Sequence, residues 1–198
     1  MMFEMNRRAM LAGLSAVVLT ACNTPPPSPQ FPELIFTHLA PIRLDVGALE
    51  IVDRYSNTSR AIDVALGMPV PPVVAARQWA RDRLVPSGKG GVVVFTITDG
   101  SVLETPLTLT KGVRGVVTND QSERYDGRLA VKIEIWDGTG QRTGEVSAEA
   151  TRSRTVPENL SLNERDKVWF EITESLIVDF DRELDRAIAQ FLSPFVIR

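Results

Sequence analysis

A β-hairpin pattern in the second half of the chain constrains the fold more than any other feature. Apolar and polar residues alternate over residues 125–136, which is typical of a strand with one buried and one solvated face. Asp137-Gly138-Thr139-Gly140 has the composition of a hairpin turn, and a second alternating stretch covers residues 142–152. Its inward positions carry small residues, Val146, Ala148 and Ala150. We therefore expect an antiparallel hairpin with a bulky element packed over its second strand.

The bulky element is expected to be a long final helix. Ser161 and Glu164 have the spacing of a capping box, which marks a helix start. Apolar residues then recur at intervals that keep them on one helix face: Val168, Trp169, Ile172, Leu176, Phe180, Leu184, Ile188 and Phe191. A helix of about 30 residues measures about 45 Å. That length is large for this domain, so a bend or break near residues 178–181 stays open.

The first half of the chain predicts two strands and one helix. Residues 42–51 alternate as a strand with a bulge at Gly47, and residues 53–72 form a loop. Helical spacing over residues 73–84 predicts a helix that residues 86–91 stop. Residues 92–98 form a β-branched strand with an edge extension at Val102 and Leu103. Residues 105–123 favour a mobile connection, with a short strand at 107–109 as the alternative.

This order of elements predicts an α/β (α+β) fold with two layers. We expect a mostly antiparallel sheet with two helices on one face, forming a single domain over residues 42–198. A hydrophobic content of 43% is ordinary for a globular protein. The net charge of −3 lacks the basic excess typical of nucleic-acid binding.

The N-terminus has the organisation of an export signal. Arg7 and Arg8 supply a basic flank, and residues 10–20 form an apolar run of signal-peptide length. The run is too short to span a bilayer, which takes about 20 apolar residues. Leu19-Thr20-Ala21-Cys22 follows, with small residues before the only cysteine. The sequence leaves open whether the chain starts at Met1 or Met5, and whether export uses the general or the twin-arginine route.

Leu19-Thr20-Ala21-Cys22 resembles the lipobox of bacterial lipoproteins. The resemblance implies a signal peptide over residues 1–21, cleavage between Ala21 and Cys22, and acyl chains such as palmitate on Cys22. The covalent lipid would be the only prosthetic group, and the membrane the first partner. Asn23 is not the aspartate associated with inner-membrane retention in enteric bacteria, so the resemblance favours the outer membrane, with the domain facing the periplasm.

A proline-rich tether follows the cysteine. Residues 23–32 read N-T-P-P-P-S-P-Q-F-P, a composition that favours extended polyproline II of about 3.1 Å per residue. We assign residues 22–41 to the acylated cysteine and this tether. A docking ligand for a partner protein is the alternative interpretation of the prolines.

Residues that could perform chemistry are sparse. His38 is the only histidine, and a metal centre or a nucleophile with its base needs more partners than that. Asp179, Asp181, Glu183 and Asp185 alternate around a helix, so they are expected on a solvated, ion-paired surface and not at a metal. We therefore expect no catalytic residues and no metal. The candidate contact surface comprises Trp136, on the polar side of its strand, and Arg77 and Arg81 on the first helix.

The body also resembles small outer-membrane lipoproteins of the YajG type and ABC-transport auxiliary lipoproteins such as PqiC. The resemblance covers residues 42–192 through the order of elements: the first strand, the helix around Trp79-Ala80-Arg81, the hairpin at Asp137-Gly138 and the last helix. It implies an anchored domain that works by contact, and PqiC-like proteins support lipid movement.

Three functions follow in order of preference. The first is a non-enzymatic binding or scaffold component of the cell envelope with a protein partner. The second is an auxiliary lipoprotein of an ABC-type lipid transport system with a lipid ligand. An open groove lined by Leu176, Phe180 and Leu184 would favour this second function, and a closed core would count against it. The third is an enzyme, which would need carboxylates that converge in a pocket.

Overall fold

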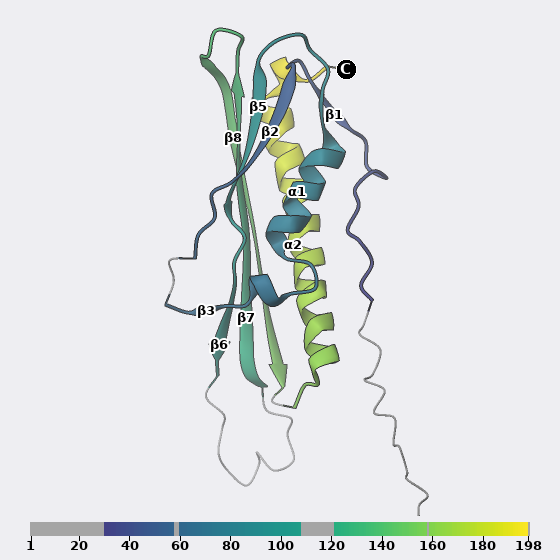
Figure 1. Cartoon of the computed structure of the whole chain (residues 1–198), viewed down its shortest axis with the longest axis vertical. Coiled ribbons are helices and arrows are strands. Elements are labelled where there is room, and N and C mark those ends of the chain that lie inside the picture. The colour runs from purple at the N-terminus through teal and green to yellow at the C-terminus, as the bar shows by residue number, and fades with distance from the viewer. Residues whose placement is uncertain (1–29, 58–59, 108–120, 158, 198) are drawn as a thin grey trace, which may run out of the picture.

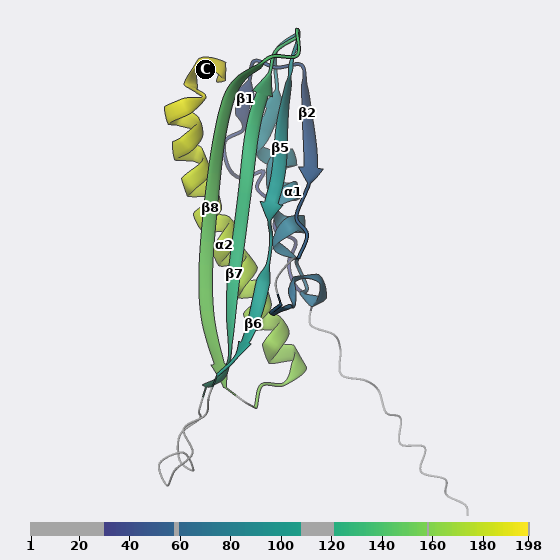
Figure 2. The same ribbon diagram turned by 90° about the vertical axis from the view of Figure 1, so that its left-hand side faces the viewer.

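The protein is an α+β domain in which one curled mixed sheet is backed by two helices on a single face (Figure 1, Figure 2). The structure, a computed structural model, describes residues 30–57, 60–107, 121–157 and 159–197. The predicted signal peptide, Ala21, Cys22 and the tether up to residue 29 lie outside the described residues. The predicted two-layer α+β architecture is confirmed.

The predicted hairpin supplies the central strand of the main sheet, β7, and one of its edge strands, β8. β7 (Gln121–Trp136) and β8 (Arg142–Pro157) pair antiparallel, with Val131 opposite Ala148 and Ile133 opposite Val146. The Asp137 carboxylate closes the turn by accepting hydrogen bonds from the backbone N–H groups of Thr139 at 2.8 Å and Gln141 at 2.9 Å. Both strands are longer than predicted, because pairing continues past the residues that alternate.

Two shorter strands follow one another along the other side of β7. β5 (Val92–Asp99) and β6 (Val102–Pro106) both pair antiparallel with β7. β2 (Ala48–Asp53) lies parallel to β5, and β3 (Ile62–Asp63) lies antiparallel to β6. Thus the ends of the stretch 105–123, expected to be a connection, belong to β6 and β7. Residues 108–120, with most of the alternative strand 107–109, lie outside the described residues.

The first predicted strand is in fact two strands in two sheets. β1 (Ile42–Leu44) pairs parallel with β4 (Leu84–Pro86) in a separate two-stranded sheet, whereas β2 joins the main sheet. Gly47 is therefore not a bulge within one strand but lies between two. Its N–H donates to the carbonyl groups of Gly90 and Gly91 at 3.0 and 3.1 Å. The prediction was wrong because alternation reports which face is buried, and carries no information about the partner strand.

Two helices cover the sheet. α1 (Pro72–Arg83) matches the predicted helix, although Leu84 is already extended and begins β4. α2 (Leu162–Phe191) starts with the predicted capping box, in which Ser161 and Glu164 bond each other's backbone N–H. It continues without a break through residues 178–181. Two short 3-10 turns complete the chain, η1 (Ala65–Gly67) within the predicted loop 53–72 and η2 (Ser193–Phe195) after α2.

The core between the layers is centred on three aromatic side chains. Trp79 of α1 packs on Phe95 of β5 at 5.9 Å and on Phe180 of α2 at 5.4 Å between ring centroids. Leu176, Phe180 and Leu184 are all 0% exposed. The groove that would have favoured a lipid-transport subunit is therefore closed. Phe191, the last residue of the predicted apolar stripe, is 59% exposed and lies outside the core.

Gly91 is a position where the backbone demands glycine. It has a φ of +78°, and an added Cβ would lie 2.5 Å from the carbonyl oxygen of Trp136. Gly91→Ala is therefore expected to lower the free energy of unfolding by about 1–3 kcal/mol through backbone strain alone. Urea denaturation measures this loss. Gly138→Ala is the control, since its Cβ would meet nothing within 4 Å. An equal loss in both variants would contradict the role of Gly91.

Candidate contact surface

The three residues of the predicted contact surface do not lie together. Trp136 ends β7 on the face that Glu134 shares, and it is half-buried. Arg77 and Arg81 belong to α1, which covers the opposite face of the sheet. Arg77 forms an ion pair with Asp53 of β2 at 2.6 Å, and Arg81 is exposed. Contact of each residue with a partner stays a prediction, but they cannot form one continuous surface.

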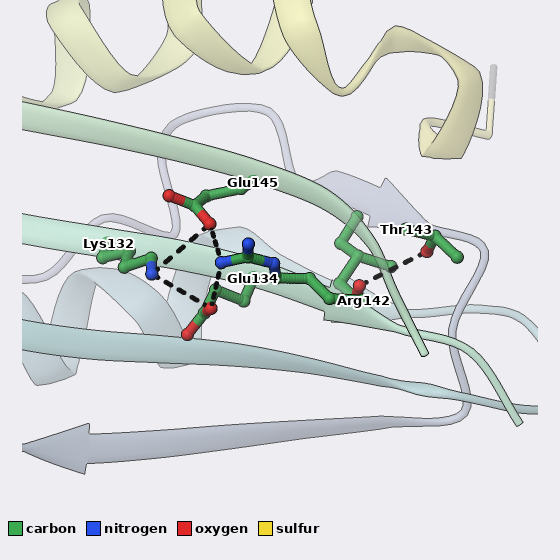
Figure 3. A network of polar contacts seen from close by, with 6 residues as sticks. Lys132, Glu134, Arg142, Thr143 and Glu145 are labelled. Atoms are coloured by element: carbon green, nitrogen blue, oxygen red, sulfur yellow. Dashed lines mark hydrogen bonds and ion pairs between the residues drawn. The ribbon is translucent and has the colours of Figure 1, made fainter. Parts of the chain in front are cut away.

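The outer face of the sheet carries a ladder of ion pairs. Figure 3 shows Lys132 and Arg142 reaching toward Glu134 and Glu145 across the hairpin. The Lys132 Nζ lies 3.0 Å from Glu134 and 3.3 Å from Glu145, and the Arg142 Nη1 lies 3.0 Å from Glu134. The hydrogen bond from Lys132, assisted by that from Arg142, lowers the pKa of Glu134. This face is therefore polar and suited to water, although such surface pairs each stabilise the fold by only about 0–1 kcal/mol.

A charged cluster lies between the two helices, where the sequence predicted a solvated, ion-paired surface. Arg83 of α1 is 3% exposed. Its Nε lies 3.4 Å from Asp181 of α2, and its guanidinium also bonds Asp185 and the carbonyl oxygen of Ala40. Asp181 accepts a further hydrogen bond from the Trp79 Nε1 at 2.7 Å. The guanidinium stacks over the Trp79 ring at 5.7 Å from its centroid.

The predicted ion pairing is therefore present, and Asp185 is 44% exposed as expected, but the prediction of a solvated position was wrong for Asp181, whose side chain is only 16% exposed. Two signals in the sequence point to the pairing. Arg83 follows Ala76 and Ala80 on the buried stripe of α1, and Asp181 and Asp185 are four residues apart, so they share a helix face. Sequence spacing cannot show that these two faces meet, because they belong to helices about 100 residues apart. The cluster ties α1, α2 and residue 40 together.

Residues 31–40, assigned from sequence to the tether, pack against the helices. The Phe31 ring stacks on Phe170 of α2 at 5.1 Å between centroids. Phe36 is buried, and its N–H donates to Asp82 of α1 at 2.8 Å. With the bond from Arg83 to Ala40, this segment is held at three places. The chain therefore enters the domain beside α2, on the helical layer.

Three neighbouring hollows lie on the helical side. The first, of about 340 Å³, includes Leu66 and Val74 in its wall. The second, of about 260 Å³, is lined by Val74 and Ile35. The third, of about 470 Å³, lies between residues 32–39 and α2 and is lined by Ile35 and Val178. The first and second hollows share Val74, and the second and third share Ile35. We name Leu66, Val74, Ile35 and Val178, which line these neighbouring hollows, the apolar band.

The apolar band is unusually exposed for its composition. Leu66 is 95% exposed, Ile35 52%, Val178 50% and Val74 48%. Isolated exposed aliphatic residues are ordinary, but a contiguous group on one face marks an interaction surface. No signal in the sequence identified the band, because its members come from four separate segments.

The polar groups in the first hollow are engaged in the fold. The Tyr55 hydroxyl donates to Asp63, and burial together with this hydrogen bond raises the pKa of Tyr55. The other carboxylate oxygen of Asp63 accepts from the backbone N–H groups of Ala65 at 3.0 Å and Val102 at 3.1 Å. These bonds hold η1 and β6 in place. The hollow thus presents mainly apolar surface.

Within the described ranges, no three His, Cys, Asp or Glu side chains lie close enough together to hold a metal ion. His38 lines the third hollow. Among the described helices, none is both long and apolar enough to cross a membrane.

Comparison with known proteins gives weak matches of structure only. No protein family model matches the chain, and no curated protein matches its sequence. The fold is similar to the rare lipoprotein B from Shewanella oneidensis with 14% identity and a TM-score of 0.37, over 72% of this chain and 94% of that one. It is also similar to a minor lipoprotein from Acinetobacter baumannii with 14% identity and a TM-score of 0.36, over 78% and 98% of the two chains. At these TM-scores, no property of those proteins transfers to this chain.

Proposed function

We propose that this chain is a bacterial lipoprotein whose domain faces the periplasm from a membrane anchor on Cys22. The observation that carries the proposal is Leu19-Thr20-Ala21-Cys22, placed after Arg7, Arg8 and an apolar run of signal-peptide length. Cleavage between Ala21 and Cys22 removes residues 1–21 and leaves the only cysteine at the new N-terminus. Asn23 favours the outer membrane as the final location.

The anchor is strong enough to hold the domain permanently. Each methylene of an acyl chain that is buried in the bilayer contributes about 0.8 kcal/mol to membrane binding. A single chain therefore binds reversibly, whereas two or three chains hold the protein stably at the membrane. From Cys22 to Phe31 the chain has nine residue steps, which span at most about 32 Å at 3.6 Å each. The domain is therefore confined to a thin layer beside the membrane, where its effective concentration toward membrane partners is high.

Within that layer, we propose that the domain is a non-enzymatic binding or scaffold component of the envelope. Two observations support contact in place of catalysis. The buried ionisable cluster is engaged in fold-stabilising pairs, because Arg83 binds Asp181 and Asp185. The helical side also presents the exposed aliphatic side chains of the apolar band, which suit contact. The closed core at Leu176, Phe180 and Leu184 counts against the lipid-transport alternative.

The anchor is tested by intact-mass spectrometry of the protein expressed in a bacterium. We expect a chain that begins at Cys22 and carries a diacylglycerol adduct, recovered with the membranes. Cys22→Ser is expected to abolish the adduct, because serine lacks the thiol that carries the lipid. Ser28→Ala, which changes the tether and leaves the lipobox intact, is the matched control and should be acylated normally. Recovery of the native chain as an uncleaved species with a free thiol would refute the lipoprotein assignment.

A further inference from the structure

We propose that the apolar band, Leu66, Val74, Ile35 and Val178, is a membrane-contact surface that rests on the hydrocarbon edge of the bilayer holding the anchor. This inference rests on the proposed lipid anchor at Cys22, and it goes further by specifying which face of the domain the bilayer meets. The occupant is the bilayer itself.

The tether enters the domain at the band. Pro32 and Glu33 line the third hollow together with Ile35, and Phe31 packs on α2 immediately before them. The band therefore begins where the anchored chain joins the fold. A tether of at most about 32 Å keeps this point close to the membrane in every orientation. By comparison, α2 alone is about 45 Å long, so the far parts of the domain are less constrained.

The two faces of the domain differ in what they can press against a membrane. The outer sheet face carries the ion pairs among Lys132, Glu134 and Glu145, which would lose solvation against hydrocarbon. The helical face carries the band and the tether entry. Since the two faces are opposite sides of one sheet, contact through the helical face leaves the charged ladder in water. The observed polarity of the domain thus matches a peripheral membrane protein held on its helical side.

Positive and negative side chains both lie around the band, and this mixture indicates which kind of lipid contact to expect. Arg182 lines the third hollow with a side chain 60% exposed, but it pairs with Asp179, and three acidic residues line the same hollow: Glu33, Glu174 and Asp181. Electrostatic attraction to anionic lipids therefore has no net positive surface to act on. The contact should instead depend on burial of aliphatic side chains, and it should persist with zwitterionic lipid and at high salt.

The test uses the acylated mature protein, in which an introduced cysteine is the only free thiol. Val178→Cys and Leu66→Cys place an environment-sensitive fluorophore in the band, and Thr151→Cys places it at an exposed position of β8 as the control. Each labelled protein is incorporated into phosphatidylcholine vesicles that contain a nitroxide lipid. We expect the nitroxide lipid to quench the labels at 178 and 66 and to leave the label at 151 unaffected. Equal quenching at all three positions, or at none, would overturn the proposal.

A second variant separates the band from the anchor. Ile35→Asp is combined in turn with Leu66→Cys and with Thr151→Cys. Both double variants should still float with the vesicles through their acyl chains, and the nitroxide lipid should quench the label at position 66 less than in Leu66→Cys alone. Circular dichroism checks that the variant is folded.

Flotation of the parent protein without quenching in the band would refute the contact surface and leave the anchor intact. Failure of the parent to float would refute the anchor. In a further outcome, the fluorophores become shielded from water as the protein-to-lipid ratio rises, and the nitroxide lipid does not quench them. That result would show that the band binds a second copy of the chain, and it would overturn bilayer contact.

Discussion

Trp79→Ala is expected to lower the free energy of unfolding by about 3–5 kcal/mol, the usual cost of truncating a buried aromatic residue. Trp79 is 0% exposed and packs against Phe95 and Phe180, so the substitution opens a cavity where α1, α2 and β5 meet. It also removes the hydrogen bond that Trp79 Nε1 donates to Asp181. Because three elements lose contacts at once, the surrounding side chains cannot all move in to fill the space.

Urea denaturation followed by circular dichroism measures this effect. Trp79→Phe separates the two contributions, since it retains an aromatic ring and loses the donor to Asp181. Its expected cost of about 1.5–3 kcal/mol is that of losing a hydrogen bond to a charged group. Trp136→Phe is the matched control at a half-buried tryptophan outside the aromatic cluster, and it should cost less than Trp79→Phe. Similar losses at positions 79 and 136 would contradict the central role of Trp79.

Arg83→Ala is expected to cost about 3 kcal/mol, the lower end of the range for breaking a buried ion pair. Its loss leaves Asp181, whose side chain is 16% exposed, without its cation. It also leaves the Ala40 carbonyl without its donor, which loosens the segment that carries the tether. The expected loss of stability is not larger because Asp185 is 44% exposed, so water can solvate its carboxylate when the guanidinium is absent.

Arg81→Ala provides the control for Arg83→Ala on the same helix. Arg81 is exposed, so its removal should change stability by no more than about 0.5 kcal/mol.

Asp185→Asn should cost less than Asp181→Asn, because Asp181 is the more buried partner. The losses from Trp79→Phe and Arg83→Ala should not add in the double variant, since both residues contact Asp181. Equal losses at positions 81 and 83 would refute the buried cluster.

The sequence was sufficient wherever a pattern is local. The alternation over residues 125–136 and 142–152 predicted β7 and β8 with the correct inward residues, because a strand turns its side chains with a period of two. The capping box at Ser161 and Glu164 and the apolar stripe predicted α2, because both depend on neighbours within one or two turns. The small residues Ala148 and Ala150 even indicated that a large element would pack over β8.

Prediction was insufficient wherever two distant segments meet. Residues 42–51 were predicted to be one strand with a bulge at Gly47, yet β1 pairs with β4 and β2 with β5. The predicted contact residues Trp136, Arg77 and Arg81 lie on opposite sides of the sheet. The apolar band combines Ile35, Leu66, Val74 and Val178 from four segments, and no sequence period connects them.

The sequence by itself determined the secondary structure of the β7–β8 hairpin and the last helix, the two-layer class of the fold, and the lipobox on which the proposed anchor depends. Each of these follows from interactions between residues close in the chain, which sequence patterns record directly. Only the tertiary structure decided that Arg83 meets Asp181, that the core under α2 is closed, and that the exposed Ile35 and Val178 line the hollow where the tether enters. These features depend on which faces of distant elements come together, and that choice is made by packing across the whole domain.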